Sequence, residues 1–334
     1  MKRRMPVGAT TLLALLALGS AACGSGSDET AAVNPAAEGA APKMLTEAPL
    51  VPNIKAGQSY RPTKLRFASI SGADEESSAA RSKLFVDYLA KTLGIQIDFV
   101  QTTDYSSVIE AMRAGRVDMA GFGPFSHVIA ASEANAEPLV ALPNQTTGLL
   151  GYKSLIITNV GSGVNTIADL KGKSMAFADP ASTSGHLFPR LILAENGITD
   201  YQAYLKDVVF SGGHDASLLA VENNRIDAAG VCDTCIERFF REGKADKSKI
   251  KVIAESQTIP PSPVSVRADL DPDLKTKITD AYLAMLANAP DVIQKANSLS
   301  TPPKHGYAKV DEAMFNVVRD VAVKLKVDLK ELER

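Results

Sequence analysis

Three consecutive hydroxyl residues, Ser182, Thr183 and Ser184, stand where a predicted strand gives way to a predicted helix. The first N–H groups of a helix lack partners within it and carry partial positive charge, and hydroxyl groups add rotatable donors. Gly185 follows and lets the backbone approach a ligand closely. Such a set of donors holds a tetrahedral oxyanion without Lys or Arg. The alternative is a Ser/Thr helix cap, for which one hydroxyl suffices.

An enzyme is the second hypothesis for these residues. Ser184, either His186 or His214, and several Asp residues are the types found in a nucleophilic triad. The Gly-x-Ser-x-Gly motif is absent, however, because Ser182 stands where its first Gly belongs. A phosphate-binding Gly-x-x-x-x-Gly-Lys loop and a His-Glu-x-x-His motif are absent as well. A secreted hydrolase is therefore the weaker alternative, and no catalytic residue is assigned.

Strands and helices alternate along most of the chain, and this alternation positions the hydroxyl run. The expected strands are 65–70, 95–100, 117–122, 155–158, 174–178, 208–210, 226–229 and 250–253. The expected helices are 75–93, 105–114, 124–131, 167–170, 184–195, 216–223, 234–242, 271–286, a short one from 290, and 311–325. Such alternation predicts parallel sheets flanked by helices. Ligands of open parallel sheets bind beyond the carboxyl ends of the strands, where the loops 102–105, 122–126, 178–186, 211–215 and 231–234 are expected.

The N-terminus has the pattern of a secretion signal. Basic residues at 2–4 precede a short apolar run at 12–18 and small residues that end in Cys23. The apolar run is too short to span a bilayer. The small residues before the cysteine resemble the lipobox of bacterial lipoproteins, which implies a signal peptide at 1–22 and a lipid on Cys23. An ordinary cleaved signal is the alternative. Residues 23–63, rich in Ala, Gly, Ser and Pro, are expected to be the lipidated N-terminus and a flexible tether.

Two further cysteines, Cys232 and Cys235, form a Cys-Asp-Thr-Cys segment after a predicted strand. Outside the cytoplasm a pair at this spacing is expected to form a disulfide, which would brace the loop that carries Asp233. A redox-active pair is the alternative. A zinc site needs more ligands than this pair supplies, so no metal and no cofactor are expected.

Length and charge limit the possible partners. The 334 residues suffice for two domains, and 36 Lys and Arg against 38 Asp and Glu give a net charge of -2. No basic excess is present to bind nucleic acid. Trp is absent and aromatic residues make up 6%, so stacking surfaces for sugars or single strands have little material.

Several short motifs match one protein family in their order along the chain. They are Thr103-Asp104-Tyr105, Ile109 to Arg113, Val117-Asp118, Gly123-Pro124-Phe125-Ser126, Gly151-Tyr152, Asp179 to Pro189 and Gly213-His214-Asp215. With them, residues 64–267 resemble the phosphate, phosphite and phosphonate substrate-binding proteins of ABC importers. The resemblance implies an α/β fold of the type II periplasmic-binding-protein class. Each of its two lobes would be a mainly parallel sheet flanked by helices, and two crossing strands would join the lobes.

The resemblance also implies boundaries and site residues. Lobe 1 would comprise 64–154 plus 266–334, and lobe 2 would comprise 155–265 with the crossing strands. The residues that the family uses for its ligand correspond here to Tyr105, Ser126, Tyr152, Ser182, Thr183, Ser184, Gly185, His214 and Asp233. The hydroxyl run would bind the phosphonate oxygens, and the tyrosines and the histidine would each donate a hydrogen bond. His127 and His305 lack such context and are expected at the surface.

The acidic residues bear on the ligand. Family members that bind aminoalkylphosphonates carry one acid near Asp233 and another in the return crossing, where this chain has Ser262. An amino-bearing phosphonate is therefore disfavoured, and phosphite, phosphate or a small alkylphosphonate is expected. An ionised Asp233 accepts hydrogen bonds without donating, so it would favour a ligand with a P–OH group over sulfate.

The expected protein is an extracytoplasmic lipoprotein, held at the outer face of the cell membrane, that captures a small phosphorus oxyanion. It would deliver this ligand to an ABC permease and its ATPase, acting as a monomer and without enzymatic activity. Closure of the lobes would bury the ligand between helix N-termini.

Overall fold

The computed structural model describes residues 59–70, 75–102 and 104–327, the side chains of 75–78 excepted. All of them lie in one compact unit, Ala41–Arg334. The predicted signal peptide, Cys23 and the tether up to residue 58 lie outside the described residues. Among the described helices, none is long and apolar enough to cross a membrane.

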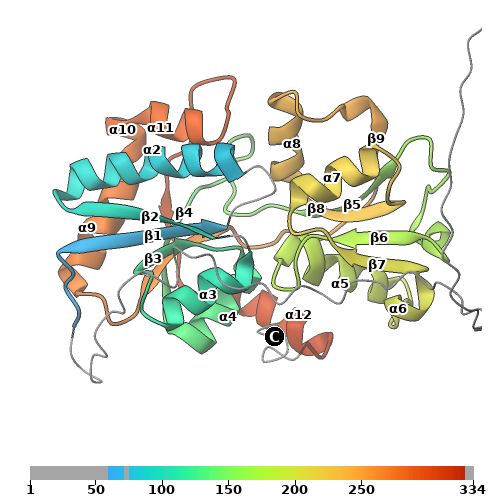
Figure 1. Ribbon diagram of the computed structural model, residues 1–334, viewed down its shortest axis with the longest axis horizontal. Coiled ribbons are helices and arrows are strands. Elements are labelled where there is room, and N and C mark those ends of the chain that lie inside the picture. The colour runs from blue at the N-terminus through green and yellow to red at the C-terminus, as the bar shows by residue number, and fades with distance from the viewer. Residues whose placement is uncertain (1–58, 71–74, 103, 328–334) are drawn as a thin grey trace, which may run out of the picture. The chain divides into compact units, whose positions relative to one another are not determined.

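The described chain forms two sheets, each flanked by helices (Figure 1). The first has the strand order β11-β4-β10-β3-β1-β2. Its strands are β1 (Lys64–Ile70), β2 (Gln96–Thr102), β3 (Met119–Gly121), β4 (Ala136–Ala141), β10 (Pro263–Arg267) and β11 (Ala308–Lys309). The second has the order β7-β6-β8-β5-β9. Its strands are β5 (Ser154–Asn159), β6 (Ser174–Phe177), β7 (Asp207–Phe210), β8 (Ala228–Cys232) and β9 (Ile250–Glu255).

Both sheets are mixed, whereas the sequence predicts mainly parallel ones. The pairs β1–β2, β1–β3, β6–β7 and β6–β8 are parallel. In contrast, β10 runs antiparallel to β3 and β4, β11 runs antiparallel to β4, and β5 runs antiparallel to β8 and β9. Of these strands, β10 and β5 directly follow a passage of the chain from one sheet to the other. A parallel neighbour needs a crossover connection, usually a helix, and these two strands have none before them.

The two passages between the sheets, 142–153 and 256–262, pair over a short stretch. Tyr152 and Ile259 form an antiparallel bridge in which each N–H donates to the other residue's carbonyl oxygen, at 3.1 and 2.8 Å. The N–H of Ser256 donates to the carbonyl of Ser154 at 2.9 Å. The crossing is therefore a short two-stranded ribbon. Its returning segment enters the first sheet at Pro263, where β10 begins.

Helices cover both faces of each sheet (Figure 1). The first sheet has α2 (Glu75–Leu93), α9 (Pro272–Leu283), α10 (Met285–Asn288) and α11 (Pro290–Ala296) on one face, and α3 (Tyr105–Arg113) and α4 (Pro124–Ala134) on the other. The second has α7 (His214–Glu222) and α8 (Asp233–Arg241) on one face, and α5 (Phe188–Glu195) and α6 (Tyr201–Tyr204) on the other. Shorter turns are η1 (Ile167–Leu170), η2 (Thr183–Leu187), η3 (Lys247–Lys249) and η4 (Glu312–Phe315).

Successive side chains of a strand point to opposite faces of the sheet, so each sheet has one hydrophobic core on each face. In β5, Ile156 packs with the helices on the α5 side, while Leu155 and Ile157 pack with α7 and α8. In β6, Met175 likewise faces α5. Because the strands are buried on both faces, they appear in the sequence as continuous apolar runs.

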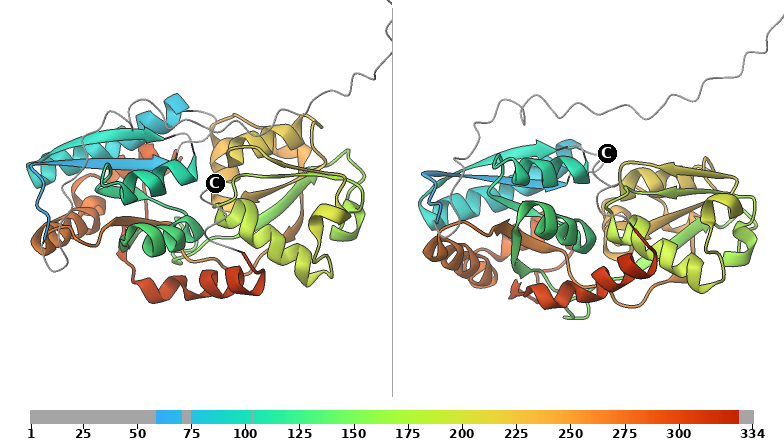
Figure 2. Two further views of the ribbon diagram at one scale, coloured as in Figure 1. Left: turned by 60° about the horizontal axis from the view of Figure 1, so that its bottom comes forward. Right: turned by 90° about the horizontal axis from the view of Figure 1, so that it is seen from below.

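The last helix, α12 (Asn316–Lys324), packs across both lobes (Figure 2). Its Val318 lies in one hydrophobic cluster with Phe125 of α4 and Phe188 of α5. The ammonium of Lys324 lies 3.1 Å from a carboxylate oxygen of Glu195. The helix α12 therefore packs against helices of both sheets, α4 of the first and α5 of the second, and links the two lobes.

Candidate functional site

A cavity of 520 Å³ opens where elements of both sheets converge. Its wall includes residues from the end of β1, α2, the passages between the sheets, η2, and the N-termini of α7 and α8. Six of the nine ligand residues predicted from the sequence line it, namely Tyr105, Tyr152, Ser182, Thr183, Ser184 and His214. Three do not: Ser126, Gly185 and Asp233. The described structure therefore brings together most, but not all, of the predicted cluster.

The hydroxyl run starts a single wide turn, η2, ahead of α5, where the sequence predicts one continuous helix from 184. Ser182 is the N-cap, and its Oγ accepts from the N–H of Gly185 at 3.0 Å. The carbonyl of Ser184 is held by the hydroxyl of Ser154 at 2.7 Å. Wide π-type turns of this kind are rare and occur often at functional sites. The hydroxyls are thus presented by a backbone that is fixed at both ends.

The N-termini of α4 and η2 meet at this point. The hydroxyl oxygen of Thr183 accepts from the N–H of Phe125, in the first turn of α4, at 2.8 Å. Because this oxygen serves as an acceptor, the hydroxyl proton of Thr183 is available for a ligand. The positive ends of two helix dipoles from opposite lobes therefore point at the same place.

Two tyrosines supply neutral donors. The Tyr105 hydroxyl lies near Ser182, and the Tyr152 hydroxyl lies near Ser184, Thr183 and Ser262, close enough for each of these groups to lower the pKa of the phenol. Burial raises the pKa of Tyr152 to about 12 and raises the pKa of Tyr105 as well. Both phenols therefore keep their protons at neutral pH and donate to an anion without repelling it.

His214 begins α7 and is also neutral at pH 7. Burial lowers the pKa of its imidazole to about 4, and the charge of Asp215 opposes this effect. Its Nδ1 is buried and has no hydrogen-bond partner among the described residues. A neutral imidazole has one donor nitrogen and one acceptor nitrogen. His214 thus offers a directed hydrogen bond to a ligand in the cavity, and no net charge.

Gly185 and Ser126 have packing and capping roles in the structure. A Cβ on Gly185 would lie 2.4 Å from the Cβ of Ala178 and 3.0 Å from Cε1 of His214. Gly185 is therefore needed for close packing beneath His214. Ser126 is fully buried, and its hydroxyl donates to the carbonyl of Gly123 at 3.0 Å, within the first turn of α4. The ligand contacts implied for these two residues by the family resemblance stay a prediction.

Asp233 is not among the residues that line the cavity either, and the ligand contact implied for it by the family resemblance stays a prediction. Its N–H donates to the carbonyl of Lys153 at 3.1 Å, and its Oδ1 accepts from the N–H of Thr234 at 2.6 Å. Asp215 lines the cavity instead, and one of its oxygens accepts from the N–H of Ala216 at 2.9 Å. One carboxylate of the wall thus follows His214 directly in the sequence, and Glu237 supplies another.

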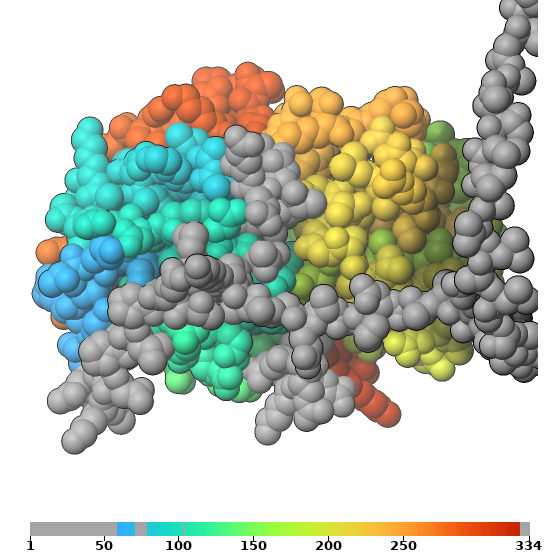
Figure 3. All heavy atoms as spheres, in the orientation of Figure 1, coloured from blue at the N-terminus to red at the C-terminus, as the bar shows by residue number. Residues whose placement is uncertain are grey.

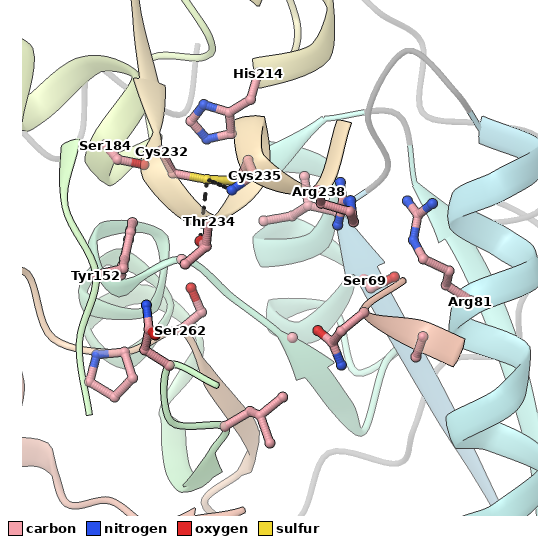
Figure 4. A pocket seen from close by; sticks show the side chains of 18 of the residues that line it. Ser69, Arg81, Tyr152, Ser184, His214, Cys232, Thr234, Cys235, Arg238 and Ser262 are labelled. Atoms are coloured by element: carbon pink, nitrogen blue, oxygen red, sulfur yellow. Dashed lines mark hydrogen bonds between the residues drawn. A yellow bond between two sulfur atoms is a disulfide. The ribbon is translucent and has the colours of Figure 1, made fainter. Parts of the chain in front are cut away.

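Cys232 and Cys235 form a disulfide that lines the cavity (Figure 4). Their Cα atoms lie 5.2 Å apart, and Sγ of Cys232 accepts from the N–H of Cys235 at 3.2 Å. The disulfide links the end of β8 to the first turn of α8. The ligand atoms of His214 and the two cysteines lie within 4.8 Å of one another. Joined sulfurs provide no thiolates, so these three residues cannot form a zinc site in the disulfide form.

The expectation that His127 lies at the surface is wrong. Its side chain is fully buried in α4, with Nδ1 at 3.0 Å from the hydroxyl of Ser265 and Nε2 at 2.9 Å from a carboxylate oxygen of Glu312. His305 is partly exposed. Because its partners come from β10 and η4, His127 links distant segments of the first lobe.

Sequence reasoning missed a polar stripe on α8. Thr234, Arg238 and Arg241 line the cavity, together with Arg81 on α2. The first three have the spacing i, i+4 and i+7, which places them on one helical face. This helical spacing, which begins within the Cys-x-x-Cys segment, could have indicated from the sequence that these residues line the site.

A second contact between the lobes lies beside this stripe. The guanidinium of Arg241 donates to the carbonyls of Ser298 and Asn297 at 3.1 and 3.2 Å. The hydroxyl of Ser298 donates to Glu242 at 2.5 Å. In the space-filling view the segment after α11 and the end of α8 meet at the surface (Figure 3). These contacts hold the lobes together on the side of the cavity away from the crossing.

Arg241→Ala is expected to weaken ligand binding several-fold, because it removes two hydrogen bonds that exist only when the lobes are together. The measurement is the ligand Kd by calorimetry, with small-angle scattering of the ligand-free protein to detect a larger radius of gyration. Arg225→Ala, at an exposed position away from the cavity, is the matched control. Equal affinity and equal scattering for both variants would contradict this role of Arg241.

His186 gives a pH-dependent prediction. Its imidazole packs against Phe177 and Phe210, Nδ1 lies 2.7 Å from the carbonyl of Pro180, and burial lowers its pKa to about 4. The pKa in the unfolded chain is about 6.5, so stability is lost as the pH falls below that value. At pH 5 the loss from this residue is about 2 kcal/mol. His186→Phe is therefore expected to reduce the fall in unfolding free energy between pH 7 and pH 5, measured by urea titration, and an unchanged fall would contradict the assignment.

Comparison with known proteins identifies the family of this chain. The family described as "ABC transporter, phosphonate, periplasmic substrate-binding protein" matches residues 67–315. The phosphate-import protein PhnD of Mycolicibacterium smegmatis is 32% identical over 66% of this chain and 71% of its own length. The phosphonates-binding periplasmic protein of Escherichia coli is 31% identical over 66% of this chain and 65% of its own length.

A solved structure has the same fold. It is the binding protein component of an ABC phosphonate transporter from Pseudomonas aeruginosa, with a TM-score of 0.71 and 26% identity over 80% of this chain and 87% of that one. The two-lobed type II periplasmic-binding-protein fold predicted from the sequence is thereby confirmed. Taken with the family match over most of the chain, this shows that the protein belongs to the phosphonate family of periplasmic substrate-binding proteins of ABC transporters.

Proposed function

We propose that this protein captures a small phosphorus oxyanion, a phosphonate, phosphite or phosphate, and delivers it to an ABC permease. The observation that carries the proposal is the convergence of three hydroxyls, two phenols and an imidazole on one cavity at two helix N-termini. All these donors are neutral at pH 7. The names of the two curated relatives, one for phosphate and one for phosphonates, support this ligand class.

The recognition mechanism follows from these donors. A tetrahedral oxyanion placed among Thr183, Ser184 and Tyr152 would accept hydrogen bonds from hydroxyls that already contact one another. Two further hydroxyls would bind it as well, that of Ser182 from the same lobe and that of Tyr105 from the first lobe. Binding would therefore add contacts to both lobes and favour their closed arrangement. The permease and its ATPase would then recognise that arrangement.

A thermal-shift screen tests the ligand class. Methylphosphonate, phosphite, phosphate and sulfate are each added to the purified protein in excess. A ligand that binds only the native state adds about 2.7 kcal/mol to the free energy of unfolding at one hundred times its Kd. This added stability raises the melting temperature. At least one phosphorus anion is expected to raise it above the effect of sulfate. Equal shifts for all four anions would argue for a general effect of salt.

The proposal includes a binding role without catalysis and an attachment to the membrane. Steady turnover of phosphate esters or phosphonates by the purified protein would contradict the first part. Acylation of Cys23 is proposed on the lipobox resemblance alone, since that residue lies outside the described part of the chain. Cys23→Ser is expected to release the protein from the membrane fraction of the producing cells. A monomer, expected for this function, is testable by light scattering.

A further inference from the structure

The cavity is larger than a single phosphorus oxyanion. Its volume is 520 Å³, whereas phosphate or methylphosphonate, with five heavy atoms, fills roughly two to three water volumes of about 30 Å³ each. Ser184 and Tyr152, which belong to the hydroxyl cluster, lie at one side of the pocket in Figure 4. The opposite side has a different chemistry, so a ligand that extends across the cavity would meet a second set of groups.

Two arginines lie on that opposite side. Arg81 comes from α2 of the first lobe and Arg238 from α8 of the second, and their guanidinium groups turn toward each other (Figure 4). Arg81 makes no hydrogen bond or ion pair with any described residue. Nε of Arg238 is buried without a hydrogen-bond partner, at 3.7 Å from Glu242. The carboxylate of Glu242 is shared with Ser298 and with Lys244, at 2.5 and 2.9 Å.

These two cations repel each other in a partly desolvated site. Burial, and secondarily the charge of Arg81, lower the pKa of Arg238 to about 10, so Arg238 stays charged at neutral pH. A buried structural arginine elsewhere in the same protein, in contrast, is paired with a carboxylate. Arg66 is held by both carboxylate oxygens of Asp118, through Nε at 3.0 Å and Nη2 at 2.8 Å. Among the residues whose side chains the structure describes, no carboxylate is placed in this way between Arg81 and Arg238.

The other charged residues of the wall leave this side positive. Arg241 is a third cation, already bound to backbone carbonyls. The acidic residues are Asp215, which accepts from a backbone N–H, and Glu237, whose side chain is exposed. A bound anion between Arg81 and Arg238 would replace a repulsion by two attractions.

We propose that the natural ligand carries a second anionic group, a carboxylate or phosphoryl group on a short carbon chain, which binds between Arg81 and Arg238. This inference rests on the proposed function, because the phosphorus group occupies the hydroxyl cluster. The planar guanidinium fork matches the oxygens of such groups. Since the two arginines belong to different lobes, the second anionic group also couples binding to closure. An amine at the same position is repelled.

Calorimetry with matched ligands tests the inference. Propylphosphonate, 3-phosphonopropionate and 2-aminoethylphosphonate have chains of the same length and end in a methyl, a carboxylate and an ammonium group. We expect 3-phosphonopropionate to bind about tenfold or more tightly than propylphosphonate, and 2-aminoethylphosphonate to bind more weakly than both. Methylenediphosphonate tests a phosphoryl group in place of the carboxylate.

Two variants locate the effect. Arg238→Gln and Arg81→Gln are each expected to reduce the preference for 3-phosphonopropionate to about threefold or less, while the affinity for propylphosphonate changes less than about threefold. Arg225→Gln, an exposed arginine outside the cavity, is expected to keep the full preference. Circular dichroism melting shows whether each variant folds. Because the two arginines lie on different helices, a variant that does not fold leaves the other variant to test the inference. If neither variant folds, the ligand series on the unmodified protein tests it.

The outcomes separate this inference from the proposed function. Equal binding of propylphosphonate and 3-phosphonopropionate overturns the inference and leaves phosphonate binding intact. A preference that survives in both arginine variants overturns it as well. Absence of binding for every phosphorus anion overturns the proposed function, and the inference with it.

Discussion

Thr183→Ala is expected to weaken binding of methylphosphonate by about 1–3 kcal/mol. Two contacts explain the size of this effect. The hydroxyl proton of Thr183 would be lost to the ligand, and the N–H of Phe125, which donates to the hydroxyl oxygen at 2.8 Å, would lose its partner inside a buried site. An unsatisfied buried donor costs more than the net value of one hydrogen bond. The measurement is the Kd by calorimetry.

Thr183→Ser is the matched control, because it keeps the hydroxyl and removes only the methyl group. It is expected to bind methylphosphonate nearly as well as the unmodified protein. If the alanine and serine variants lose affinity equally, the hydroxyl is not the group that binds. If neither loses affinity, the ligand lies elsewhere in the cavity.

Gly185→Ala is the second substitution with a large expected effect, and it acts by crowding. The new Cβ would lie 2.4 Å from the Cβ of Ala178 and 2.7 Å from the hydroxyl of Ser182, closer than Cβ atoms approach. Overpacking of this kind costs about 1–3 kcal/mol of stability. Ligand affinity should fall as well, because relief of the clash displaces the Ser182 hydroxyl and the ring of His214, 3.0 Å away.

Two further variants distinguish crowding from a general intolerance of alanine. Gly161→Ala places its Cβ no closer than 3.4 Å to Asn159, so it is expected to leave stability and affinity nearly unchanged. Adding Ala178→Gly to Gly185→Ala removes the closest clashing atom and is expected to restore part of both. Urea unfolding and calorimetry measure the two quantities. A Gly185→Ala protein of unchanged stability would show that this contact is not as tight as described.

Local sequence patterns predicted much of the fold. The helix α2 has the expected bounds, 75–93, and the strands β1, β2, β5, β6 and β9 agree within two residues. These elements have strong apolar periodicity or compact apolar runs between turn signals, and such signals are local. The loops that carry the site were found for the same reason.

Three strands were missed because their formation depends on distant partners. β4 pairs with β10 and β11, which lie more than one hundred residues further along the chain. Pro138 in β4 and Pro263 in β10 also speak against a strand, since proline cannot donate to the ladder. The same argument covers the burial of His127, whose partners Ser265 and Glu312 are remote in sequence.

The differences between the predicted site and the cavity lining concern which way neighbouring side chains face. Asp233 and Thr234 are adjacent at the start of α8, and consecutive residues in a helix point about 100° apart. The family resemblance placed Asp233 at the cavity, while the rotation of the helix against β8 decides that Thr234 lines the cavity and Asp233 does not. The same rotation brings Arg238 to the wall. The hydroxyl run was predicted because a turn with three donors at a strand end has few other uses.

The central claim, capture of one phosphorus oxyanion by the hydroxyl cluster, is tested most directly by calorimetric titration of the purified protein with methylphosphonate, alongside the Ser182→Ala/Thr183→Ala/Ser184→Ala variant. The account predicts saturable binding of one ligand per chain to the unmodified protein and no measurable heat with the variant, whose fold is checked by its circular dichroism melting curve. Binding of equal affinity to both proteins, or no binding of any phosphorus oxyanion to the unmodified protein, would contradict it.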